Sequence, residues 1–168
     1  MIAFMIATAG VSVASSPDLG KAEGRCRPGE SGASFLVDVV GLKDRIGRLK
    51  LELYPANDQD FLADDNVLIA AGETFRRVEA TIPSTGPVEL CIRAPGPGTY
   101  ALSLLHDRNS DRKFALSVDG IGFAGNPHLG LSKPSAASAS ARVSAEPTRI
   151  SITMNYRRGL FSFGPLEH

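Results

Sequence analysis

The residues with the greatest capacity for chemistry lie together between positions 106 and 113. His106 and Asp107 are followed by Asn109, Asp111 and Lys113, so oxygen-bearing side chains recur at every second position. Such a spacing can bring three oxygen ligands onto one hard cation, and Ca²⁺ takes six to eight oxygens in loops of this kind. Asp107, Asn109 and Asp111 therefore form a candidate calcium site.

The same residues are also typical of an Asx-rich hairpin turn, whose side chains accept hydrogen bonds from their own backbone. A calcium loop turns on glycine where this chain has Arg112, and the usual bidentate glutamate is missing further on. Arg108, Arg112 and Lys113 also place three positive charges beside the carboxylates. We favour the turn, and the calcium site is the alternative.

Groups that could carry catalysis are few. His106 and Asp107 are adjacent in a predicted strand, so their side chains point to opposite faces and cannot form a base–orienter pair. His128 has no neighbouring His, Cys or Asp at a useful spacing, and His168 ends a Leu-Glu-His that resembles the remnant of an expression tag. No serine-hydrolase elbow, phosphate loop, dinucleotide fingerprint or zinc-protease motif is present. We expect no enzyme and no cofactor; a hydrolase that uses His106 is the less favoured alternative.

A second candidate is the acidic segment that contains Asp58, Asp60, Asp64 and Asp65, in which no Lys or Arg occurs. Four carboxylates in one loop could hold a cation or meet a basic partner. A run of this kind is more often a solvated connection, which is the interpretation that we prefer.

The composition limits the classes of function. The 168 residues carry 18 Lys+Arg against 18 Asp+Glu, and 43% of them are hydrophobic. This is the profile of one ordinary globular domain, and its neutrality argues against a nucleic-acid partner, which would require a basic surface. The 17 Gly and 11 Pro indicate many turns.

The elements that must position these residues are strands. Apolar and polar residues alternate in four segments, which predicts half-buried strands at 49–54, 77–82, 88–93 and 150–157. Residues 33–40 are more continuously apolar, which favours a strand covered on both faces, and residues 132–144 predict an edge strand entered through a loop. No amphipathic helix is expected; the best candidate is a single turn at 59–63. We predict an all-β fold, an immunoglobulin-like or prealbumin-like antiparallel β-sandwich of seven or eight strands.

The N-terminal part of the sequence favours export. Residues 1–14 are apolar and uncharged, too short to span a bilayer, and end in a small-x-small pattern, which predicts a signal-peptide-like segment; a buried strand is the alternative. Cys26 and Cys91 lack metal or redox spacing, so in an exported chain we expect them to pair rather than remain free thiols. The chain then divides into the leader, an arm at 15–32, a sandwich domain at 33–158 and a tail at 159–168. We expect a periplasmic or secreted protein with no transmembrane segment after cleavage.

The central block resembles a bacterial family, the domain-of-unknown-function family 2141. Three motifs carry the resemblance: Pro97-Gly-x-Tyr-Ala leading to His106-Asp-x-Asn-x-Asp-x-Lys113, then Gly120-x-Gly-Phe-x-x-Asn126, then Ile150-x-Ile-x-x-x-Tyr156. The similarity covers roughly residues 34–156 and implies an exported bacterial β-sandwich, with no established activity to carry over. We expect the two loops at residues 106–113 and 120–128 to form the rim of a binding or interaction module for an envelope protein or a glycan. The residues expected on this rim are His106, Asp107, Asn109, Asp111, Lys113, Gly122, Phe123 and Asn126.

Overall fold

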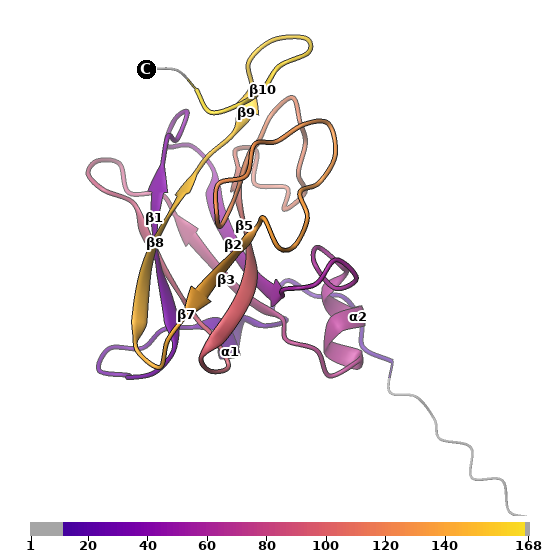
Figure 1. Cartoon of the computed structure of the whole chain (residues 1–168). Coiled ribbons are helices and arrows are strands. Elements are labelled where there is room, and N and C mark those ends of the chain that lie inside the picture. The colour runs from indigo at the N-terminus through magenta and orange to yellow at the C-terminus, as the bar shows by residue number, and fades with distance from the viewer. Residues whose placement is uncertain (1–11, 167–168) are drawn as a thin grey trace, which may run out of the picture.

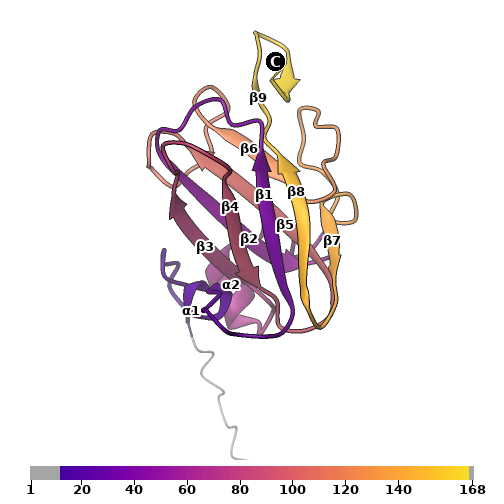
Figure 2. The ribbon, with the colours of Figure 1, turned by 90° about the vertical axis from the view of Figure 1, so that its left-hand side faces the viewer.

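The fold is a sandwich of two β-sheets (Figures 1 and 2). It is seen in a computed structural model, which describes residues 12–166. The smaller sheet has the order β4-β1-β8, from strands β4 (Glu89–Arg93), β1 (Ser34–Val40) and β8 (Pro147–Thr153). The larger has the order β3-β2-β5-β6, with β7 beside the first half of β5: β3 (Arg76–Thr81), β2 (Arg48–Pro55), β5 (Gly98–Asp107), β6 (Gly120–Phe123) and β7 (Ser140–Val143). A small hairpin follows, made of β9 (Tyr156–Arg157) and β10 (Phe163–Gly164).

The predicted all-β sandwich is confirmed, with eight strands in its two main sheets. One pairing differs from the prediction, because β1 and β8 run parallel, in a register that extends from Ser34 opposite Pro147 to Val40 opposite Thr153. The alternation of apolar and polar residues shows which face of a strand is buried, but it contains no information on strand direction. The sequence therefore could not distinguish this parallel pair from an antiparallel one.

Two short helices were not predicted, namely α1 (Lys21–Gly24) and α2 (Asp65–Ala70). Neither is long enough to display a 3.6-residue period, which is the signal that identifies a helix in sequence. The predicted turn near residues 59–63 is present as hydrogen-bonded turns, with the Phe61 amide donating to the Asn57 carbonyl and the Ala63 amide to the Asp60 carbonyl.

Residues 12–166 form two apolar cores, one on each face of the larger sheet. The inner core lies between the sheets and includes Phe35, Leu51 and Leu104. The outer core lies against the far face, where Tyr54, Phe61, Leu68, Phe75 and Phe123 pack with apolar residues of the flanking loops. Because of this second layer, the strand buried on both faces is β5, whose last seven residues are all buried. We expected double burial for residues 33–40, but the outward-facing Asp38 and Val40 of β1 are half-buried and exposed.

The N-terminal arm is attached to the sandwich by a disulfide between Cys26 and Cys91, which confirms the predicted pairing. A β-bridge between Arg25 and Ile92 lies beside the disulfide, and the arm packs so closely on β3 that Gly24 has no room for a side chain against the Arg77 backbone. Of the predicted leader, residues 1–11 lie outside the described part of the chain. Among residues 12–166, no helix is long and apolar enough to cross a membrane.

Candidate functional site

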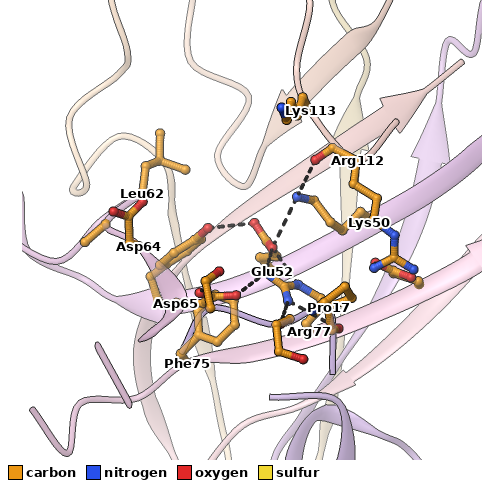
Figure 3. Close-up of a pocket in the computed structure, with 15 residues that line it drawn as sticks. Pro17, Lys50, Glu52, Leu62, Asp64, Asp65, Phe75, Arg77, Arg112 and Lys113 are labelled. Atoms are coloured by element: carbon orange, nitrogen blue, oxygen red, sulfur yellow. Dashed lines mark hydrogen bonds and ion pairs between the residues drawn. The ribbon is translucent and has the colours of Figure 1, made fainter. Parts of the chain in front are cut away.

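A cavity of about 500 Å³ lies on the outer face of the larger sheet (Figure 3). Its floor is the polar side of two neighbouring strands, with Lys50, Glu52 and Tyr54 from β2 and Arg77 and Glu79 from β3. In β2 these side chains alternate with leucines that face the inner core, so the same period of two builds the core and the floor of the cavity. The walls come from residues 15–17 of the arm, residues 62–65 before and within α2, and residues 112–113.

Arg77 is the centre of a buried ion network in the cavity floor. It is only 7% exposed. Its Nε donates to Glu52 Oε1 at 2.8 Å, and its Nη2 donates to Asp65 Oδ2 at 3.2 Å. The Tyr54 hydroxyl donates to the second oxygen of Glu52 at 2.7 Å. The network therefore joins β2, β3 and α2 under the cavity.

The same guanidinium also holds the N-terminal arm. Arg77 Nη1 donates to the carbonyls of Ser16 and Pro17 at 3.0 and 3.3 Å, and the Ser15 hydroxyl donates to Asp65 at 2.6 Å. The Phe75 ring lies beneath the Arg77 guanidinium, 4.9 Å from its centroid. Five groups from four segments thus fix one side chain, and the arm forms a wall of the cavity because of these contacts.

The environment sets the charge of each group in the floor. Burial raises the pKa of Asp65, but hydrogen bonds from Ser15, the Asn66 amide and Arg77 outweigh it, so the net pKa lies below the usual range. Burial also lowers the pKa of Arg77, and the carboxylates of Glu52 and Asp65 more than restore it. Burial, reinforced by Glu52, raises the pKa of Tyr54 well above its ordinary value. At neutral pH Asp65 is therefore ionised, Arg77 is charged and the Tyr54 phenol is protonated.

Positive charge predominates at one end of the cavity, where Lys50, Arg112 and Lys113 lie together (Figure 3). Lys50 Nζ is 3.4 Å from Glu52 Oε1, a carboxylate already bound to Arg77. Arg112 contacts Glu79 Oε1 at 3.1 Å. Lys113 is exposed and forms no ion pair with any residue between 12 and 166.

Glu79 is shared by more cations than it can neutralise. Its side chain is 7% exposed and faces Lys21 at 3.3 Å, Arg48 at 3.8 Å and Arg112 at 3.1 Å. Its Oε2 accepts no hydrogen bond within the described chain, although the Lys21 ammonium is within ion-pair distance. One buried carboxylate thus contacts three basic side chains, of which Lys21 also pairs with Asp18 at 3.6 Å.

His106 lies inside the sandwich and not on the predicted rim, since none of its surface is exposed. Its Nε2 donates to the Ile46 carbonyl at 2.8 Å, because a carbonyl can only accept. Its Nδ1 must then accept from the Tyr156 hydroxyl at 2.6 Å. Burial lowers the pKa of His106, and the hydrogen bond to Ile46 only partly opposes this. The side chain is a neutral structural link between β5 and β9.

Asp107 and Asp111 organise their own loop, as an Asx turn does. Both oxygens of the buried Asp107 accept backbone amides, from Asp111 at 3.1 Å and Arg112 at 2.8 Å. Asp111 accepts from the Lys113 amide and the Asn109 side chain. A third carboxylate, Asp119, lies within 4.8 Å of these two and accepts the amides of Arg108 and Ala115. All six carboxylate oxygens of this cluster therefore already accept hydrogen bonds.

The residues of the second predicted loop serve the packing of β6 against β8. A methyl group on Gly122 would lie 2.6 Å from Ile152 and 2.8 Å from the Thr153 carbonyl, so this close approach requires glycine. Phe123 is 4% exposed in the outer core. The side chain of Asn126 donates from Nδ2 to the Ser151 carbonyl at 3.0 Å. Its Oδ1 accepts a hydrogen bond from the Thr153 backbone amide at 2.8 Å.

Of the eight residues expected on the rim, Lys113 is the one that lines the charged cavity. The floor residues on β2 and β3 were missed because alternation assigns them to a solvated face. A usable signal does exist, since the two strands place Glu52 opposite Arg77 and Lys50 opposite Glu79 in their register. Two opposite-charge pairs at matching positions of adjacent strands indicate a structured polar face. Asp65, from the acidic segment, joins the same network.

The chain belongs to a bacterial protein family of uncharacterised function. The model of the family described as an uncharacterized protein conserved in bacteria (DUF2141) matches residues 37–151, which is more than half of the chain. The match confirms the family indicated by the motifs of the central block. Comparison with curated proteins and with solved structures found no significant match.

Proposed function

We propose that this protein is an exported binding module whose charged cavity holds a small ligand with an anionic group. The observation that carries the proposal is the basic end of the cavity, where Lys113 pairs with no carboxylate of the described residues and Lys50 and Arg112 share carboxylates that other cations already occupy. A carboxylate or phosphate placed there would receive charge-assisted hydrogen bonds from up to three side chains. The disulfide supports an oxidising compartment outside the cytoplasm.

The opposite end of the cavity favours a ligand that is more than a bare anion. The half-buried Leu62 and Ala63 offer apolar surface, and the exposed carboxylate of Asp64 can accept hydrogen bonds from hydroxyl groups. An acidic sugar combines these features, because it carries one carboxylate, several hydroxyls and apolar ring faces. Binding is preferred to catalysis because His106 is engaged on both ring nitrogens in the interior.

The proposal can be tested by isothermal titration with glucuronate as the anionic probe and glucose as its neutral counterpart. We expect saturable binding of glucuronate, no binding of glucose, and affinity about tenfold or more lower in Lys113→Glu, since one hydrogen bond to a charged group contributes about 1.5–3 kcal/mol. Lys133→Glu is the matched control, because it makes the same charge change outside this cavity. Equal affinity for the two sugars, or loss of glucuronate binding in the control alone, would refute the proposal.

A further inference from the structure

A second cavity, of about 280 Å³, differs from the first in being almost wholly apolar. It lies between three segments: the loop before β6, the loop after it, and the β9–β10 hairpin. The Phe114 and Phe163 rings meet edge to face, with centroids 6.3 Å apart, and so join the first of these loops to the hairpin. Phe123 and Leu129 form part of its lining, and Leu131 lies at its edge.

Most of the exposed large apolar side chains of the described chain lie on these three segments. Within residues 12–166, eight large hydrophobic side chains are exposed, and five of them belong here: Phe114, Leu116, Leu131, Leu160 and Phe161. Leu131 is 96% exposed and Phe161 is 94% exposed. Figure 1 shows the hairpin at the top of the molecule, at the same end as the loops beside β6. Exposed apolar side chains gathered at one end of a domain point to an interaction site.

The charge around this surface is positive. Lys133 lines the cavity, and Arg157 and Arg158 lie on the hairpin. None of the three forms an ion pair with a described residue; each donates to a backbone carbonyl instead. From Gly120 to Leu166 the sequence contains a single acidic residue, Glu146. The surface therefore combines protruding leucine and phenylalanine side chains with cations that pair with no carboxylate between residues 12 and 166.

We propose that this end of the sandwich docks on a membrane surface that contains anionic lipids. Leu131 and Phe161 insert between the headgroups, and Lys133, Arg157 and Arg158 contact the lipid phosphates. The exposure of the apolar side chains favours a membrane over a folded protein partner. Leu131 and Phe161 project almost fully into solvent from separate loops, and a fluid interface accepts such projections without a matching set of pockets. This inference uses a different surface from the sugar-binding proposal and does not depend on it.

The sequence lacks tryptophan, so a single introduced indole can report insertion. The Leu131→Trp variant is mixed with vesicles of phosphatidylethanolamine and phosphatidylglycerol, and its emission is compared with that on phosphatidylcholine vesicles. We expect a shift to shorter wavelength on the anionic vesicles only, weakened by salt. Val67→Trp is the matched control, because Val67 is 56% exposed on α2, away from this surface, and its emission should not shift.

Co-sedimentation of the wild-type protein with vesicles supplies the second measurement. The protein should pellet with the anionic vesicles, and both the Leu131→Ser/Phe161→Ser and the Lys133→Glu/Arg158→Glu variants should lose most of this binding while keeping the wild-type melting temperature. Wild-type protein that stays in the supernatant with anionic vesicles would overturn the proposal. So would equal binding by the two double variants and the parent, or binding to an acidic apolar peptide in place of vesicles.

Discussion

Replacement of Arg77 by methionine tests the ion network beneath the charged cavity. The substitution keeps most of the side-chain volume but removes the charge that faces Glu52 and Asp65, each less than one-tenth exposed. Breaking a buried ion pair costs about 3–5 kcal/mol, because a carboxylate is left without compensation in a poorly solvated site. Lys50 remains 3.4 Å from Glu52, so we expect the lower end of that range, about 3 kcal/mol.

Urea unfolding at neutral pH measures this loss directly. Arg76→Met is the matched control on the same strand, because Arg76 is less buried and its hydrogen bond goes to the Glu23 carbonyl; we expect a loss below about 1 kcal/mol. Adding Glu52→Gln to Arg77→Met should recover part of the stability, since it removes one of the unpaired charges. If Arg77→Met unfolds within about 1 kcal/mol of Arg76→Met, the network does not stabilise the fold as described.

The pH dependence gives an independent check on the same residue. The pKa of Asp65 is lower in the folded protein than in the unfolded chain, so its contribution to stability is present above about pH 4 and is lost as the pH falls through the folded-state pKa. Removing Arg77 removes one of the groups that lower this pKa. The difference in unfolding free energy between wild type and Arg77→Met should therefore narrow below about pH 4.

Four further predictions concern the scaffold. Because burial lowers the pKa of His106, wild-type stability in urea should fall as the pH drops below about 6.5, and His106→Gln but not His128→Gln should flatten that dependence. Gly120→Ala should cost about 1–3 kcal/mol in the same assay, because its methyl group would overlap the Tyr156 ring, whereas Gly159→Ala, in open space, should be nearly neutral. Reduction of the disulfide, which joins residues 65 apart, should cost about 4 kcal/mol and lower the melting temperature accordingly. Millimolar calcium should leave the melting temperature unchanged, because the carboxylate oxygens around Asp107 already accept hydrogen bonds; a clear rise would support the cation site instead.

The strands were predictable because the alternation of apolar and polar residues can be recognised within a single short segment of the sequence. The segments predicted at 49–54 and 77–82 correspond closely to β2 and β3, and the disulfide followed from the two cysteines and the expected compartment. The outer core was not predictable. Phe61 and Leu68 lie in connections without a regular period, and only the folded chain shows that they cover the far side of the larger sheet.

The candidate site was even less accessible to sequence, because it combines segments that are distant along the chain. The arm at Ser16 and the β3 residue Arg77 meet through a backbone carbonyl, which leaves no trace in residue type. The family motifs point elsewhere, since His106, Gly122 and Asn126 serve packing and internal hydrogen bonding. The residues of the family motifs thus maintain the scaffold. The cavity is lined by residues that, in the sequence, look like the ordinary polar face of a strand.

The parallel pairing of β1 with β8 limits when the smaller sheet can be completed. Phe35 and Val37 emerge early during synthesis, yet the strand that completes their sheet begins only at Pro147. Contacts between such distant segments require closure of a long loop, so they form late and slowly. Until β8 is available the smaller sheet is incomplete and its apolar residues remain exposed. We therefore expect the smaller sheet to be completed only when almost all of the chain has been made, whereas every strand of the larger sheet precedes β8 and can pair earlier.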